Sequence, residues 1–323
     1  MWFKKVLLNL LIIGSVLGKN LRIPQEVKKD LPKEEEKSII KGISWFGFET
    51  EYKNLMCTWS HDIEWHLNTI KQIGFNYIRL PFSLEYIIEG NWKEMDIFFK
   101  KSKELGLDVV LDFHRLHSSH QSAKPYDNVY TFDDFLFGWK TILERYKDFD
   151  NLKAVDIFNE YQSGNYVEWN NLARQIISFI ETNFPERFQY FVGGTNWGGN
   201  LHNMDLSDLP YYSRIRYSIH KYWFSDSEPY DEKWDYSFGD HKPVINVGEW
   251  GYMSEVKSET EWAERFVEYL RENDLRDTFF WTYSHNSGDT GGILLEASKS
   301  RSGQDCTDVD YKKMLLLHHL WED

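Results

Sequence analysis

The chain has 323 residues, of which 37 are Lys or Arg and 51 are Asp or Glu, so its formal net charge at pH 7 is −14. This acidity argues against a broad phosphate-binding surface and excludes nucleic acid from the expected partners. Two cysteines are too few for a disulfide scaffold or a four-cysteine zinc site. Aromatic residues make up 17% of the chain, with 14 Trp, and those beyond the needs of a core suit stacking on the faces of sugar rings.

The first 18 residues predict a secretory signal peptide. Lys4 and Lys5 are followed by an apolar run over residues 6–16. This run is shorter than the roughly 20 residues that a membrane-spanning helix needs. An uncleaved anchor and a buried helix are the alternatives. Cleavage near residue 18 predicts a secreted, extracellular protein with no membrane attachment. Residues 19–38 are highly charged and lack periodicity, which predicts a linker or disordered arm.

Short β-rich runs alternate with longer amphipathic stretches over residues 39–323. The expected strands are residues 43–49, 76–82, 108–114, 154–160, 190–194, 215–222, 244–251 and 278–284. Each interval between their starts is long enough for one helix and two loops. The expected helices include residues 62–74, 92–106, 262–273 and 309–321, with Gly74 and Gly106 at C-caps.

Eight such units in succession predict a (β/α)8 TIM barrel that forms a single domain over residues 39–323. The alternative fold is a doubly wound open sheet. That fold usually carries a glycine-rich phosphate loop near its start, whereas the glycine pairs of this chain lie in its middle, at Gly193-Gly194 and Gly198-Gly199. The barrel is therefore the favoured fold.

Polar and aromatic side chains gather where the expected strands end. In a barrel these ends converge on one face, where active sites lie. A single carboxylate at such a position is usually solvated or paired in a salt bridge, but a set at equivalent positions indicates a site. The set consists of Arg79, His114, Asn159, Glu160, His220, Tyr222, Glu249 and Trp281.

Two members of this set are glutamates on the fourth and seventh expected strands, Glu160 and Glu249. Two facing carboxyl groups are the minimum requirement for glycoside hydrolysis. One must be protonated to donate to the leaving oxygen, and the other must be ionised to attack or stabilise the anomeric carbon. Arg79 is placed to hold the ionised carboxylate and Asn159 to bond a sugar 2-hydroxyl. Trp281 offers a stacking surface for the sugar ring at the cleaved bond.

The segments that carry these residues resemble glycoside hydrolase family 5, the cellulase family, over about residues 40–322. They are, in order, ISWFGFE, NYIRLPF, VVLDFHR, IFNE, WGGNL, IHKYW, VGEWG and SGDTGGIL. The segments WGGNL and SGDTGGIL favour the endo-β-1,4-glucanase branch over mannanases. The resemblance implies a retaining hydrolase that needs no cofactor, with Glu160 as acid/base and Glu249 as nucleophile. It implies that the other members of the set listed above complete the site.

Four positions depart from the family pattern. Tyr161 follows the expected acid/base where Pro is common, and Phe158 stands where His or Leu is often found. Leu116 and His117 stand where the branch continues with Pro-Asp. These changes alter the cleft wall and remove no catalytic group, so the reaction type is better determined than the substrate.

The expected function is a secreted, monomeric endo-β-1,4-glucanase acting on cellulose or mixed-linkage β-glucan by double displacement. A related barrel hydrolase for mannan, xylan or β-1,3-glucan is the first alternative. A carbohydrate-binding barrel without catalysis is the second. Trp45 and Trp197 are expected to stack on bound glucose units. Asp289 is expected either to contact a sugar hydroxyl or to shape a turn.

The remaining candidates concern metal binding and cysteine pairing. His114, His117 and His120 form a histidine group, but no carboxylate or Cys is suitably spaced to complete a zinc site, so no metal is expected. Cys57 follows the first expected strand and Cys306 the last, and these strands are neighbours in a closed barrel. In an oxidising compartment the two cysteines could form a disulfide, and two unpaired thiols are the alternative.

Overall fold

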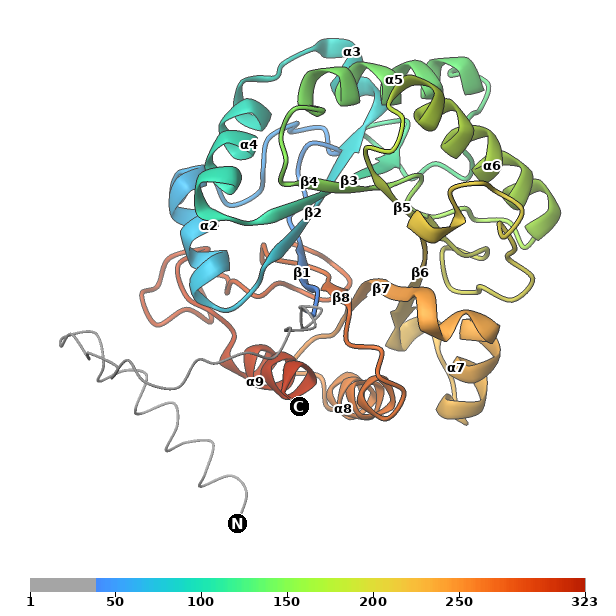
Figure 1. Cartoon of the computed structure of the whole chain (residues 1–323). Coiled ribbons are helices and arrows are strands. Elements are labelled where there is room, and N and C mark those ends of the chain that lie inside the picture. The colour runs from blue at the N-terminus through green and yellow to red at the C-terminus, as the bar shows by residue number, and fades with distance from the viewer. Residues whose placement is uncertain (1–38, 323) are drawn as a thin grey trace, which may run out of the picture. The chain divides into compact units, whose positions relative to one another are not determined.

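The computed structural model describes residues 39–322, and the predicted signal peptide (1–18) and charged arm (19–38) lie outside the described residues. Parallel strands close into a barrel in the order β1 to β8, and the helices surround it (Figure 1). The strands are β1 (Lys41–Ser44), β2 (Tyr77–Ser83), β3 (Asp108–Arg115), β4 (Leu152–Asp156), β5 (Gln189–Gly193), β6 (Ile215–Tyr222), β7 (Ile245–Gly251) and β8 (Thr278–Phe280). This closed barrel confirms the predicted fold and excludes the open sheet.

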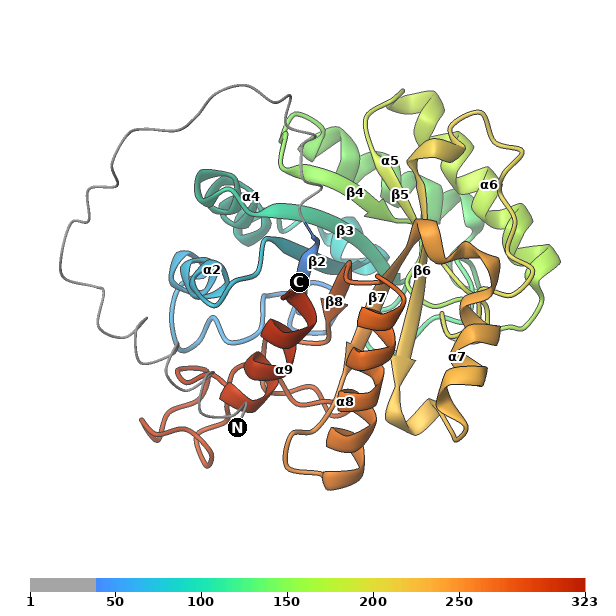
Figure 2. The ribbon, with the colours of Figure 1, turned by 60° about the horizontal axis from the view of Figure 1, so that its bottom comes forward.

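Helices fill the connections and follow the last strand. They are α2 (Ile63–Gln72), α3 (Leu84–Glu89), α4 (Lys93–Leu105), α5 (Phe132–Tyr146), α6 (Tyr166–Asn183), α7 (Tyr230–Phe238), α8 (Lys257–Glu272) and α9 (Tyr311–Trp321), with short 3-10 helices η1 (Tyr212–Arg214), η2 (Trp223–Ser225) and η3 (Gly239–Val244). Figure 2 shows α9 lying beside α8. Among residues 39–322, no helix has the length and apolar character needed to cross a bilayer.

Several elements end earlier than the sequence predicts. The strand β4 ends at Asp156 and β8 ends at Phe280, so Glu160 and Trp281 stand beyond their strands. Gly106 is the C-cap of α4, with a left-handed φ of 65°. The C-cap of α2 is instead the residue before Gly74. The polar positions of the site thus divide between strands and the loops that follow them.

The barrel interior is built in two layers. Side chains two residues apart on a strand point to the same face, so Val110 and Asp112 both point inward from β3, as Ala154 and Asp156 do from β4. The residues nearer the strand starts join an apolar cluster with Phe279. The later residues are fully buried acids. An apolar plug therefore lies beneath a charged layer, and the charged layer lies at the end where the strands finish.

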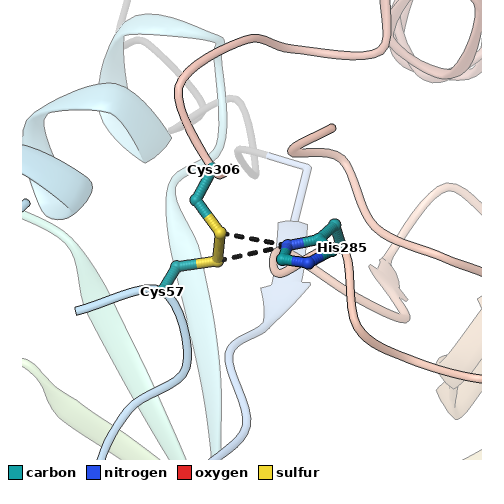
Figure 3. Close-up of side chains that lie close together, drawn as sticks. All are labelled: Cys57, His285 and Cys306. Carbon is teal, nitrogen blue, oxygen red and sulfur yellow. Dashed lines mark hydrogen bonds between the residues drawn. A yellow bond between two sulfur atoms is a disulfide. The ribbon is translucent and has the colours of Figure 1, made fainter. Parts of the chain in front are cut away.

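The loops that follow β1 and β8 are joined by a disulfide between Cys57 and Cys306, whose Cα atoms are 5.8 Å apart. The two strands pair directly, which brings these loops together despite a sequence separation of 249 residues. The Nδ1 atom of His285 lies 3.1 Å from the Cys306 sulfur and 3.9 Å from the Cys57 sulfur (Figure 3). Of the two alternatives for these cysteines, the structure has the paired one.

We expect the double variant Cys57→Ser/Cys306→Ser to lose about 2 to 5 kcal/mol of unfolding free energy, because a cross-link between distant residues restricts the unfolded chain. Urea unfolding of the wild type and the variant, with and without reductant, measures the difference. The unreduced wild type should also resist alkylation of both cysteines after denaturation. Two alkylated cysteines in that sample would contradict the pairing.

Candidate active site

A cleft of about 830 Å³ opens where the strands end. Arg79 is fully buried beneath it. The other predicted residues that line this cleft are His114, Asn159, Glu160, Trp197, His220, Tyr222, Glu249, Trp281 and Asp289. The structure therefore gathers at one place nearly all the residues that the sequence analysis selected from separate strands.

Glu249 lies within β7 and is buried among hydrogen-bond donors. Its Oε1 accepts from Nη1 of Arg79 at 2.6 Å, and its Oε2 accepts from the Tyr222 hydroxyl at 2.8 Å. Nδ1 of His220 lies 3.6 Å from the same Oε2. Burial opposes ionisation, but the charges of His220 and Arg79 outweigh it and lower the pKa of Glu249 to about 2. This carboxyl is therefore ionised at neutral pH.

Glu160 follows β4 and its side chain keeps 16% of its surface exposed. Its Oε1 accepts from Nδ1 of His220 at 3.0 Å, and its Oε2 accepts from Nε2 of Gln121 at 3.3 Å. Burial and the charge of Glu249 raise the pKa of Glu160 above its ordinary value. An oxygen of Glu160 lies within 4.8 Å of an oxygen of Glu249. The two facing glutamates thus have opposite tendencies to ionise.

Arg79 is held by acids that the sequence analysis did not select. Its Nε donates to Oδ2 of Asp156 at 3.0 Å, and its Nη2 lies 3.2 Å from Oδ2 of Asp112. Burial raises the pKa of Asp112 to about 7 and that of Asp156 to about 6, although the charge of Arg79 acts in the opposite direction. Both acids interrupt strand segments that should be apolar throughout. That interruption was the signal that could have identified them.

His114 and Asn159 form one wall of the site. His114 Nδ1 bonds Oδ2 of Asp112 at 2.6 Å, and its Nε2 lies 3.2 Å from Nδ2 of Asn159. The side-chain oxygen Oδ1 of Asn159 accepts from Nη2 of Arg79 at 2.7 Å. Burial lowers the pKa of His114 to about 4, so the ring is neutral. The indole of Trp281 stacks against it, with ring centroids 5.4 Å apart and planes 13° apart.

Trp197 and Trp45, the two tryptophans expected to stack on glucose, have different surroundings. Trp197 is 49% exposed on the cleft, which suits that role. Trp45 is fully buried, and its Nε1 donates to the carbonyl of Met56 at 2.9 Å. The prediction for Trp45 is therefore wrong. Trp45 shares a strand face with Ile43 and packs toward the helices, whereas Phe46, its neighbour, lines the cleft and stacks on Trp281.

The loop that carries Trp197 explains the glycines of the WGGNL segment. Gly198 has a φ of 72°, and a Cβ there would lie 2.9 Å from the His220 ring. Trp197 itself has a φ of 60°, a left-handed conformation that is uncommon for a large side chain. Its backbone N–H donates to the carbonyl of Tyr161, next to Glu160, at 3.0 Å. The backbone that carries the exposed indole is therefore tied to the residue that follows the expected acid/base.

Other residues of the cleft were not predicted. Phe224 is 61% exposed and stacks on Tyr222, with centroids 5.1 Å apart. Glu49 is buried and accepts from the Gly47 N–H at 2.8 Å. Phe224 lies in η2 and Glu49 follows the end of β1, and only the folded chain brings the two to the site. Asp289 also borders the cleft, where burial and the charge of Glu249 raise its pKa.

Three groups among residues 39–322 have the side chains to ligate a metal. They are Cys57 with His285 and Cys306, Asp112 with His114 and Glu249, and Glu160 with His220 and Glu249. In the first group the sulfurs are joined and are not thiolates. In the second, the guanidinium of Arg79 already bridges the two acids. The predicted histidine group, which was not expected to bind zinc, divides between two networks. His114 bonds Asp112, whereas His117 bonds Glu85 and Asp127.

Comparison with known proteins matches residues 34–287 to the family model described as cellulase, glycosyl hydrolase family 5. An endoglucanase of Paenibacillus polymyxa is 28% identical over 317 residues, covering 81% of this chain and 79% of that protein. The major extracellular endoglucanase of Xanthomonas campestris pv. campestris is 26% identical over 334 residues, covering 87% and 67%.

Solved structures agree with the family model. The endocellulase of Pyrococcus horikoshii in complex with cellotetraose superposes with a TM-score of 0.78 at 26% identity, covering 88% of this chain and 93% of that one. The catalytic domain of the Xanthomonas endoglucanase gives a TM-score of 0.77 at 25% identity, covering 88% and 94%. The barrel, the paired glutamates and the family match lead to one conclusion. This chain belongs to glycosyl hydrolase family 5, the cellulase family, and is a glycoside hydrolase.

Proposed function

We propose that this protein is a secreted, retaining endo-β-1,4-glucanase that cleaves cellulose or mixed-linkage β-glucan. The observation that carries the proposal is the facing pair of Glu160 and Glu249, one with a raised and one with a lowered pKa, in a single cleft. Relatives named as endoglucanases and a similar endocellulase that binds cellotetraose support a β-glucan substrate. One relative's description as extracellular and the predicted signal peptide support secretion.

In the first step, the ionised Glu249 attacks the anomeric carbon while Glu160 donates its proton to the leaving oxygen. The bond from the anomeric carbon to that oxygen breaks, and an ester bond to Glu249 forms. Arg79 and Tyr222 hold the attacking carboxylate in place through one hydrogen bond to each oxygen. A neutral His114 adds no competing positive charge at the wall.

In the second step, Glu160 is ionised and removes a proton from water as the water oxygen attacks the anomeric carbon. Glu249 leaves, and the two inversions give net retention. Retaining enzymes hold their carboxyl groups roughly 5–5.5 Å apart, whereas inverting enzymes leave roughly 6.5–9.5 Å for a water molecule. The oxygens of Glu160 and Glu249 approach within 4.8 Å, which supports retention.

We expect Glu249→Ala and Glu160→Ala to abolish reducing-sugar release from carboxymethylcellulose and barley β-glucan, because each removes one half of the chemistry. Azide should restore Glu160→Ala on dinitrophenyl cellobioside, since that leaving group needs no proton and azide needs no base. Proton NMR should detect the β-anomer as the first product of the wild type.

The same assay with glucomannan and xylan separates the alternatives. Activity on one of these alone would keep the mechanism and change the substrate. Folded wild-type protein with no activity on any glycan would support a binding protein. Activity that survives in Glu249→Ala would contradict the nucleophile assignment.

We expect the pH dependence of kcat/KM to distinguish the two glutamates. Glu160 acts in its protonated form, so its raised pKa keeps it competent below that pKa, and activity is lost as the pH rises through it. Glu249 acts ionised, and its pKa of about 2 keeps it competent through the mildly acidic range. The alkaline loss should appear with cellotetraose and be absent with dinitrophenyl cellobioside. An identical loss with both substrates would show that another group titrates.

We expect Trp197→Ala to raise the KM for β-glucan about threefold to tenfold, because it removes an exposed stacking surface. Trp45→Phe is the matched control. It removes the buried hydrogen bond to Met56, so it should lower the unfolding midpoint in urea and leave KM unchanged. A raised KM in Trp45→Phe with an unchanged KM in Trp197→Ala would reverse these assignments.

A further inference from the structure

The loop between β3 and α5, residues 116–131, is tied down at several points near Glu160. The backbone N–H of Ser118 donates to Oε2 of Glu85 at 2.8 Å, and His117 bridges Glu85 and Asp127 at 3.2 and 2.6 Å. These bonds give a structural role to His117, one of the positions that depart from the family pattern. The loop therefore has a fixed conformation where it borders the cleft.

Gln121 lies within this pinned loop and lines the cleft. On its C-terminal side, Ser122 Oγ accepts from the Leu116 N–H at 2.8 Å. The carbonyl of Ala123 accepts from the N–H of Gln162, two residues beyond Glu160, at 3.2 Å. These bonds hold the backbone that carries Gln121 against the segment that follows Glu160, which keeps the two side chains within hydrogen-bonding reach.

The two oxygens of Glu160 have different partners. Oε1 accepts from Nδ1 of His220, and Oε2 accepts from Nε2 of Gln121. Nδ1 of His220 faces acceptors on both Glu160 and Glu249, at 3.0 and 3.6 Å, so it carries a hydrogen. Because His220 donates to Oε1, the acid proton of Glu160 must lie on Oε2, the oxygen that contacts Gln121.

This assignment determines where the proton points. Two donors cannot face each other, so a hydroxyl hydrogen on Oε2 must turn away from the N–H of Gln121. The other groups facing Glu160 are His114, His220, Tyr222 and Glu249, and they line the same cleft. Once the proton has moved to the leaving oxygen, the same N–H donates to a carboxylate, and this is the stronger, charge-assisted form of the bond.

We infer that Gln121 is a positioning residue for the acid/base: its amide turns the acid proton of Glu160 away from the loop and toward the leaving oxygen, and then stabilises the carboxylate that remains. This inference rests on the proposed function, because it assumes that Glu160 is the acid. It adds a group from the β3–α5 loop to a site otherwise built at the strand ends.

The test compares wild type, Gln121→Met and Gln121→Glu on aryl cellobiosides from dinitrophenyl to unsubstituted phenyl, and on cellotetraose. Gln121→Met keeps the side-chain length and removes the donor. We expect it to lower kcat/KM about tenfold for phenyl cellobioside and cellotetraose. The alkaline limb of the pH profile of kcat/KM should move to higher pH by about half to one unit. Dinitrophenyl cellobioside should show little change, because it needs no acid. Gln121→Glu, which keeps the shape and adds a negative charge, should move the alkaline limb further.

His120→Ala is the matched control on the same loop, since His120 stacks on His117; its alkaline limb should match that of the wild type. An equal loss for every leaving group, or an unmoved limb in both Gln121 variants, would overturn the inference. If Gln121→Met fails to fold, the near-isosteric Gln121→Glu still gives the test. Activity of Glu160→Ala on cellotetraose would instead overturn the proposed function. The two failures are therefore distinguishable.

Discussion

The buried guanidinium of Arg79 is the constraint on which the site depends. A buried charge is costly unless its donors are satisfied. Arg79 meets this requirement with acceptors from Asp112, Asp156, Asn159 and Glu249. Three β-strands or their extensions, β3, β4 and β7, supply these acceptors to a side chain on β2, and only a closed barrel brings all of them together. Removing one acid partner from such a network costs about 3 to 5 kcal/mol, so the charged layer couples the shape of the barrel to the ionisation of Glu249, the proposed nucleophile.

The same network separates the two glutamates chemically. Glu249 receives direct hydrogen bonds from Arg79 and Tyr222, whereas Glu160 receives none from a permanent cation. Two carboxyl groups this close cannot both be ionised without a penalty. The cation next to Glu249 decides which of them keeps the charge, and burial then leaves Glu160 with the raised pKa. Their opposite tendencies to ionise thus follow from which strand ends lie against Arg79.

The fold and most of the site could be predicted because both rest on periodicity. Eight β-rich runs predict the barrel, and polar residues at the ends of those runs predict the cleft. Asp112 and Asp156 were missed, although a charge inside a buried strand was a visible signal. Trp45 was misplaced because a ring near a strand end faces either the cleft or the helices, and alternation with Ile43 puts it toward the helices. Gln121 lies in a loop and Phe224 in the short 3-10 helix η2. The position of each depends on the folded backbone, and no local sequence pattern indicates it.

The positions of the two glutamates relative to their strands suit the roles proposed for them, Glu249 as nucleophile and Glu160 as acid/base. Glu249 lies within β7 and is paired in register with His220 of β6, so the strand ladder fixes its backbone independently of its side-chain contacts. Glu160 follows the end of β4 by four residues and keeps part of its surface exposed. A nucleophile benefits from a rigid position against one carbon atom. An acid that must reach a leaving oxygen and later a water molecule needs contact with the open cleft. The position of Glu160, the proposed acid/base, then depends on the loops around it, and this is the physical ground for assigning a positioning role to Gln121.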